Sequence, residues 1–177
     1  MTDKISFGDF EKVDLRVGRI LEVEEHPNAD KLFVLKVEFG SGIGERTICA
    51  GLRGHYSAEE LKGKQGIFVV NLEPRNLRGV ESDGMILAVS SNGEVKIIKP
   101  KIDMKVGEIV RVKNSSFSKE KVKMISIDDF MKVELEVREV DGENVIVVAD
   151  GDNVGVLVAD GIPIVPDGEV EEGSKVR

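Results

Sequence analysis

Apolar and polar residues alternate along the first part of the chain. Val13, Leu15 and Val17 are separated by polar or small residues, and this period of two is typical of a strand with one buried face. The alternation would point Arg16 outward, away from the core. Further apolar runs, several of them rich in β-branched residues, predict strands at residues 32–39, 47–52, 67–70 and 85–89.

Capping patterns predict short helices among these strands. Ser57 and Glu60 have the spacing of a capping box, and Gly63 provides a stop, so one short helix interrupts the strands. Ser6 and Ser126 are each followed three residues later by aspartate, which predicts a helical turn before two different strands. The pattern as a whole favours an all-β protein built on a five-stranded OB-fold barrel with short helices.

Two segments of the chain repeat each other. Residues 5–17, ISFGDFEKVDLRV, match residues 125–137, ISIDDFMKVELEV, at eight positions with a constant offset of 120. Pro100, Gly107 and Val110 also recur, 66 positions later, as Pro166, Gly173 and Val176. The second copy is therefore a shortened repeat that has lost its middle. We predict an OB-fold domain at residues 1–112, a linker at 113–124 and a smaller C-terminal β domain at 125–177.

The connection between the runs at 67–70 and 85–89 carries the candidate binding chemistry. Pro74 fixes one backbone angle, and Gly79 and Gly84 can adopt turn conformations that other residues rarely adopt. We therefore expect this connection, residues 71–84, to form a stiff, hairpin-like rim. The shortened repeat has no counterpart of this rim. Its cations, amide and hydroxyl favour a surface that holds a polyanion, and the side chains that would present these groups are Asn71, Arg75, Arg78 and Ser82.

Charge is unevenly distributed along the 177 residues. The net charge is −8, but residues 1–112 hold 17 Lys and Arg against 18 Asp and Glu, whereas residues 113–177 hold 8 against 15. Because salt screens charges beyond about 10 Å, a local basic face can act while distant carboxylates discourage non-specific binding. The acidity of the whole chain therefore does not exclude a nucleic-acid partner.

Several kinds of chemistry find little support. The chain has one cysteine, Cys49, and therefore no internal disulfide. Because it has only two histidines, His26 and His55, we expect no metal site. We interpret both histidines as turn or surface residues. No nucleophile is paired with a base and no glycine loop suits a phosphate cofactor, so we expect neither an enzyme nor a cofactor. The N-terminus has no apolar signal core and no run is long enough to span a bilayer, which favours a cytoplasmic protein without a membrane partner.

Several motifs in a fixed order resemble a known family. VDLRVGRILEVEEHPNADKLFVLKVEFG, then RTICAGL, then the helix and NLEPRNLRGVESDGMILA, are similar to the tRNA-binding domain that occurs free-standing, in proteins of the endothelial monocyte-activating polypeptide type, and appended to methionyl-tRNA synthetases. The resemblance covers residues 5–112. It implies an OB-fold that binds the body of tRNA without catalysis, with an aminoacyl-tRNA synthetase as a possible partner. The tRNA-binding positions that it implies are Lys31, Asn71, Arg75, Arg78, Ser82 and Met85, and Arg16 is a further candidate phosphate contact.

This sequence differs from the family at several positions, and the family has more than one branch, so alternative functions and oligomeric states stay open. Members commonly carry lysine where this chain has Glu73 and Asn76, and aromatic residues make up only 5% of the chain with no Trp, which favours backbone recognition over base stacking. A secretion-related, protein-binding chaperone of the same fold is the alternative function, and it would need an exposed apolar groove. The shortened repeat resembles the extra domain of cytokine-like members, so we expect a monomer in which it acts as a pseudo-partner; a true homodimer is the alternative.

Overall fold

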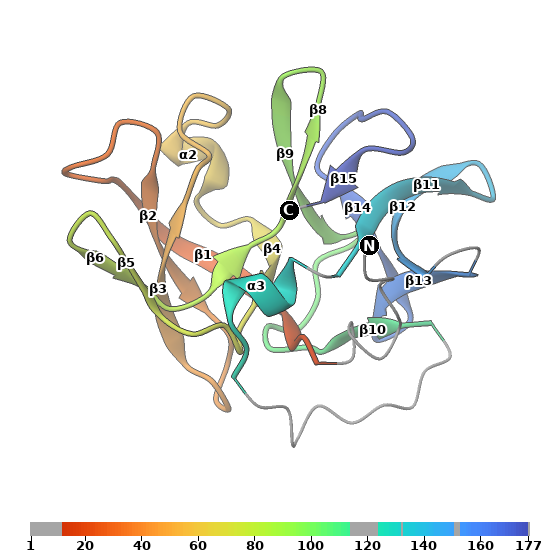
Figure 1. Cartoon of the computed structure of the whole chain (residues 1–177), viewed down its shortest axis with the longest axis horizontal. Helices are drawn as coiled ribbons and strands as arrows, with labels where there is room; N and C mark the ends of the chain where they lie inside the picture. Colours follow the sequence, from red (N-terminus) through yellow and green to blue (C-terminus); the bar gives the residue numbers. More distant parts are fainter. Residues whose placement is uncertain (1–11, 114–123, 132, 151–152, 177) are drawn as a thin grey trace.

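Two β units lie side by side in the computed structural model, which describes residues 12–113, 124–131, 133–150 and 153–176 (Figure 1). The first unit is a five-stranded antiparallel sheet in the order β3-β2-β1-β4-β7, curled into a nearly closed barrel. Where it closes, the Asp83 N–H donates to the Thr47 carbonyl at 2.9 Å. Its elements are β1 Leu15–Glu25, β2 Phe33–Glu38, β3 Glu45–Ala50, α2 Ala58–Leu61, β4 Gln65–Val69 and β7 Met85–Ile86.

The second unit is a ring of seven strands. Its sheet runs β10-β13-β12-β11-β15-β8-β9-β14, and an additional pairing of β13 with β14 closes the ring and leaves β10 at its edge. The β8–β9 hairpin and β10 thus join this sheet although they precede residue 113 in the chain. The strands are β8 Ala88–Ser91, β9 Glu94–Pro100, β10 Val110–Val112, β11 Leu135–Val140, β12 Glu143–Asp150, β13 Asn153–Ala159, β14 Ile162–Pro166 and β15 Lys175–Val176. The predicted all-β class, a five-stranded barrel with a second β unit, is confirmed, and the second unit gains β8, β9 and β10 from the first copy.

The two short helices begin as their capping patterns predict. In α2 the Ser57 hydroxyl accepts from the Glu60 N–H at 3.1 Å, and the Glu60 carboxylate accepts from the Ser57 N–H at 3.1 Å. The helix α3, Ile127–Phe130, has the same reciprocal box between Ser126 and Asp129. The turn predicted after Ser6 lies outside the described residues.

The sequence repeat is reproduced in the backbone hydrogen bonds. The Gly107 N–H donates to the Val17 carbonyl at 2.7 Å, and at the matching positions the Gly173 N–H donates to the Val137 carbonyl at 2.8 Å. Both glycines have positive φ angles, +85° and +88°. The two copies therefore use the same turn to return the chain to their first strand.

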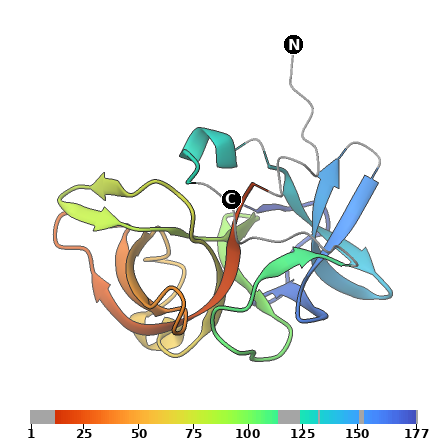
Figure 2. The same cartoon turned by 90° about the horizontal axis from the view of Figure 1, so that it is seen from below.

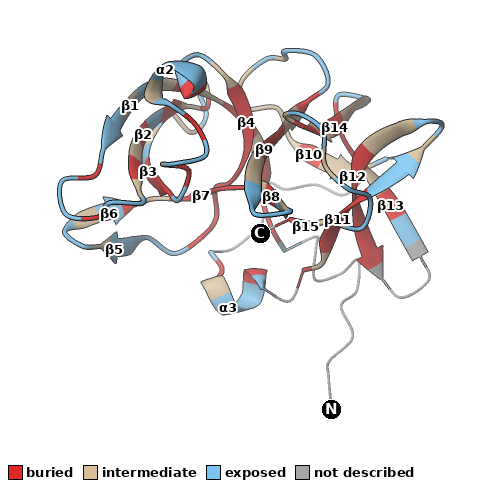
Figure 3. Cartoon of the chain, turned by 90° about the horizontal axis from the view of Figure 1, so that it is seen from above, coloured by how far each residue is buried: buried red, intermediate tan, exposed pale blue. Residues whose placement is uncertain are grey.

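The last strand of each sequence copy pairs with a strand of the other copy, within the second unit. Val110 of β10 lies opposite Ala159 of β13, and Val176 of β15 lies opposite Val89 of β8. As a result, one apolar core spans both units and contains buried residues of β1, β4, β11 and β12. A second core fills the first barrel, where the rings of Phe39 and Phe68 meet edge to face at 5.2 Å. Figure 3 shows the buried stretches of these strands in red, in contrast to the largely exposed β5–β6 hairpin.

A polar cluster also joins the units. The Tyr56 hydroxyl donates to the Asp167 carboxylate at 2.9 Å and accepts from the Ile97 N–H at 3.1 Å. The ammonium groups of Lys64 and Lys99 lie 3.3 and 3.5 Å from the same carboxylate. Burial raises the pKa of Tyr56 well above its usual range, so its hydroxyl is protonated and donates at neutral pH.

Candidate nucleic-acid interface

The predicted rim between β4 and β7 contains a two-stranded hairpin. Its strands are β5, Arg75–Leu77, and β6, Val80–Ser82, and Leu77 is paired with Val80 across a two-residue loop. Both loop residues have positive φ angles, +52° at Arg78 and +96° at Gly79, as a type I′ turn requires. Arginine rarely adopts this left-handed conformation, so a bulky cation occupies a position that suits asparagine or glycine better.

Buried His26 anchors the hairpin to the turn that follows β1. Its Nε2 lies 2.7 Å from the Leu77 carbonyl oxygen, and its Nδ1 accepts from the Asn28 N–H at 2.9 Å. The neutral tautomer with its proton on Nε2 satisfies both bonds. Only 3% of His26 is exposed, so its interpretation as a turn or surface residue missed its role as an anchor. That bond spans 51 positions, and no local pattern in the sequence indicates it.

Three cations lie on this hairpin and the adjoining turn. Arg75, Arg78 and Lys31 are all exposed, and within the part of the chain that the structure describes none of them forms an ion pair. One bond restrains Arg78, whose Nη1 donates to the Asn28 carbonyl at 3.2 Å. The guanidinium and ammonium groups thus remain available for an anionic ligand.

Arg75 also borders a groove of about 420 Å³. Because side chains alternate along a strand, Arg75 shares one hairpin face with Leu77 and Ser82, while Glu81 lies on the opposite face. The groove runs between this face, the end of β3, β7 and the β8–β9 hairpin, and Met85 lies partly exposed in its wall. Its walls are otherwise mainly apolar.

Asn71 and Ser82 have internal partners. The Asn71 side chain accepts from the Asp14 N–H at 2.8 Å and donates to the Lys12 carbonyl at 2.8 Å. The Ser82 hydroxyl accepts from the Cys49 N–H and donates to the Gly84 carbonyl, both at 3.0 Å. Both residues are buried, and their polar groups hold the two ends of the rim onto the barrel.

Arg16 does not point outward as expected. Its Nε donates to the Asp14 carboxylate at 2.7 Å, its Nη1 donates to the Gly107 carbonyl at 3.2 Å, and only 21% of its side chain is exposed. Asp14 lies just before β1 and two positions before Arg16, so in an extended chain the two side chains share a face. The candidate positions therefore separate into exposed Lys31, Arg75 and Arg78 with partly exposed Met85, and a supporting group of Asn71, Ser82 and Arg16.

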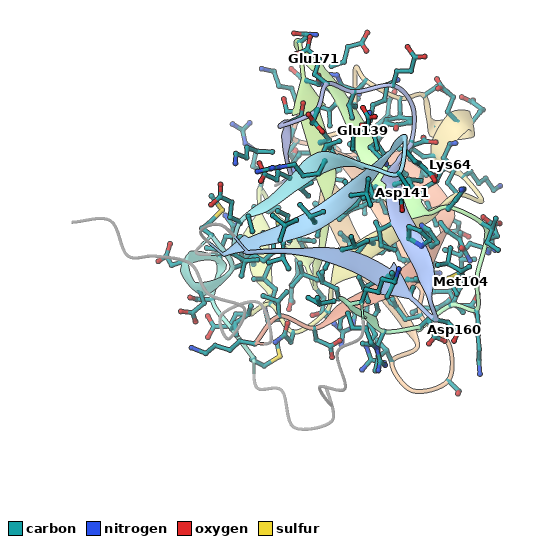
Figure 4. All side chains as sticks on the ribbon, turned by 90° about the vertical axis from the view of Figure 1, so that its right-hand side faces the viewer. Lys64, Met104, Glu139, Asp141, Asp160 and Glu171 are labelled. Carbon is teal, nitrogen blue, oxygen red and sulfur yellow. The ribbon has the colours of Figure 1, made fainter. Side chains whose placement is uncertain are left out.

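The hairpin projects at the end of the molecule opposite β11–β13 (Figure 2). That far end is acidic: Glu139 and Asp141 lie at the β11–β12 turn and Asp160 at the β13–β14 turn (Figure 4). Among the described residues there is no group of three potential metal ligands, and none of the helices there is long and apolar enough to cross a membrane. The cationic and acidic surfaces are thus well separated along the chain's longest axis.

Arg78→Asn tests whether the loop residue is kept for its charge. Asparagine tolerates the left-handed conformation, so we expect the free energy of unfolding to stay equal or rise by a few tenths of a kcal/mol. The affinity for tRNA, the ligand that the sequence resemblance implies, should fall about 10-fold because one charge-assisted contact is lost. Urea denaturation and filter binding measure the two effects. The matched control Asp141→Asn, at another position with φ of +52°, should leave the affinity unchanged; an unchanged affinity in Arg78→Asn would contradict the assignment.

A curled barrel with a rigid cationic hairpin defines a polyanion-binding β module. Comparison with known proteins identifies the family: residues 15–109 match the family described as "Putative tRNA binding domain", and the chain belongs to that family. A tRNA-binding domain is a non-catalytic module. The family assignment confirms the resemblance found in the sequence.

Two of the similar proteins match about 60% of this chain, and a third matches nearly all of it. The methionine--tRNA ligase of Pyrococcus furiosus is 50% identical over 107 residues, which are 60% of this chain and 14% of the ligase, so the chain spans about one seventh of that relative. The CsaA chaperone of Picrophilus torridus is 33% identical, with a TM-score of 0.56, over 59% of this chain and 97% of the chaperone. The C-terminal domain of Plasmodium vivax p43 is 26% identical, with a TM-score of 0.72, over 95% of this chain and 98% of that domain, so this likeness extends to the second unit.

Proposed function

We propose that this chain binds the body of tRNA through the β5–β6 hairpin and does so without catalysis. The observation that carries the proposal is the placement of Arg75 and Arg78 on one anchored hairpin, exposed and without acidic partners among the described residues. Lys31 adds a mobile charge from the neighbouring turn, and Met85 adds apolar contact. Asn71 and Ser82 act as positioning residues that hold the rim, whereas Arg16 holds Asp14 and the turn at Gly107.

Binding proceeds by electrostatic docking and then by hydrogen bonds to the sugar-phosphate backbone. A guanidinium can form two parallel hydrogen bonds to a phosphate, and a pre-ordered hairpin loses little entropy on binding. The acidic second unit, at the opposite end, disfavours docking in the reverse orientation. A synthetase is the partner that the ligase relatives suggest, and a cytoplasmic location stays a prediction.

Filter binding with total tRNA, duplex DNA and single-stranded RNA tests the proposal. We expect tRNA to bind most tightly, with log affinity falling against log salt with a slope of roughly −3, because about three phosphates are neutralised by Lys31, Arg75 and Arg78. Equal affinity for all three nucleic acids, or a flat salt response, would remove this mechanism.

The apolar groove favours a second candidate function, a protein-binding chaperone. It supplies the exposed apolar surface that such a role needs, and CsaA is among the similar structures. Competition separates the two functions: a permanently unfolded polypeptide added in excess should not displace tRNA if the cationic hairpin is the site. Displacement at equal concentration would favour the chaperone.

We also propose that the shortened repeat acts as a pseudo-partner in a monomer. The pairing of β10 and β15 with strands of the other sequence copy and the core shared by the two units cover apolar surface of β1 and β4 that would otherwise drive association. The division into residues 1–112, 113–124 and 125–177 follows the sequence copies and stays a prediction, because β8, β9 and β10 of the first copy belong to the second ring. Light scattering after size-exclusion chromatography should give the 19.4 kDa mass of one chain, and a dimer mass would count against the proposal.

A further inference from the structure

The groove beside the hairpin combines an apolar lining with a single charge. Its walls come from the end of β3 with Ala50, from β7 with Met85, from the β5–β6 hairpin with Leu77, and from the β8–β9 hairpin with Ala88. Among the described residues, Arg75 is the only charged one that lines it, and no acidic group there pairs with its guanidinium. The groove therefore suits a ligand that has both a flat apolar part and an anionic group.

The backbone around the groove argues against an added peptide strand. The facing edges of β3 and of the segment from β6 to β7 already bond to each other, through Cys49 with Ser82 and through Asp83 with Thr47. A peptide that extends a sheet needs such an edge free, and apolar peptide side chains gain nothing from a guanidinium at the rim. The charge and the closed edge favour a nucleotide over a polypeptide.

We propose that the groove holds one unpaired nucleotide of the bound RNA, with the base in the apolar lining and its phosphate on Arg75. The volume of about 420 Å³ lies in the range of small-molecule sites. Met85 offers a flexible, polarisable thioether to the base, so the site needs no aromatic side chain. This inference rests on the proposed function and adds base contact to its backbone recognition.

Methyl NMR of the full chain with small probes tests the proposal. Adenosine 5′-monophosphate should shift the methyl signals of Met85, Ala50 and Ala88 in a saturable way, and adenosine should do so at least three-fold more weakly. Ribose 5-phosphate, which lacks the base, should leave those methyl signals unchanged. No shift of the groove methyls with adenosine 5′-monophosphate up to its solubility limit would overturn the proposal, as would equal shifts with ribose 5-phosphate.

A variant with a larger side chain in the groove provides a second test of the nucleotide proposal. Ala88→Leu removes no cation and should weaken adenosine 5′-monophosphate binding at least 10-fold, while Ala58→Leu on α2, outside the groove, should not change it. Ser90→Leu, at an exposed lining position, repeats the test if Ala88→Leu does not fold. Unchanged nucleotide binding in the folded filled variants would overturn the proposal.

The outcomes distinguish this inference from the proposed function. In Ala88→Leu the affinity for tRNA should fall about 3-fold to 10-fold with the salt slope retained, because the cations remain. If tRNA binds and the mononucleotide does not, the groove inference alone fails. If the mononucleotide binds and tRNA does not, the proposed function fails. Displacement of the mononucleotide by a permanently unfolded polypeptide at lower concentration would assign the groove to polypeptides and overturn the inference.

Discussion

Reversing both hairpin charges, Arg75→Glu with Arg78→Glu, should reduce the affinity for tRNA by about 100-fold or more. Each lost contact to a charged group is worth about 1.5 to 3 kcal/mol, and each new carboxylate adds repulsion from the phosphates. The Arg75 side chain makes no internal bond among the described residues and Arg78 makes one, so the melting temperature should change little. Filter binding at fixed salt and thermal denaturation measure the two quantities.

A matched pair of reversals serves as the control. Lys36→Glu with Lys62→Glu makes the same change in net charge at two exposed positions of the first unit, on β2 and at the end of α2, outside the hairpin. Long-range repulsion should then reduce the affinity only a few-fold, because salt screens distant charges. Equal losses in the two double variants would show that net charge, and not the hairpin, controls binding.

Gly107→Ala should destabilise the protein by about 3 kcal/mol or more, whereas Gly173→Ala should cost about 1 kcal/mol. Both glycines have the same left-handed conformation at matching positions of the repeat, so alanine is strained at each. At Gly107, however, the new Cβ would lie only 2.3 Å from the Phe39 carbonyl oxygen, while at Gly173 it would meet open space. The difference between the variants isolates the steric clash.

Urea denaturation of both variants with the parent protein measures this difference. The two m-values should agree with that of the parent, since neither change alters the surface exposed on unfolding. Equal losses at the two positions would contradict the described contact between the 107 turn and Phe39, which joins the loop before β10 to the first barrel.

Local sequence patterns predicted the helix caps and turns, because these features depend on only a few consecutive residues. The Ser57 and Ser126 capping boxes form as expected because each needs only four consecutive residues. The rim was expected to be stiff, and it is a hairpin whose turn at Gly79 uses a positive φ angle. The repeat predicted a second unit of the same kind, because matching residues make matching turns.

Contacts between distant segments were not predictable in this way. The bond from His26 to Leu77 depends on the path of the barrel, and the pairing of β10 and β15 with strands of the other sequence copy depends on how two units share a core. Polar residues near strand ends, such as Asn71, look alike in sequence whether they face a ligand or close the backbone. The ion pair of Arg16 is different, since its spacing from Asp14 in an extended chain could have indicated it.

Mapping of backbone amide shifts on titration with tRNA tests the central claim most directly. In the labelled full chain, we predict that the shifts concentrate at Arg75, Arg78 and Lys31 and weaken as salt is raised. Resonances of β11, β12 and β13 at the acidic end should stay unchanged. Shifts confined to the second unit, with the hairpin resonances unaffected at saturating tRNA, would contradict the claim that the hairpin cations hold the RNA.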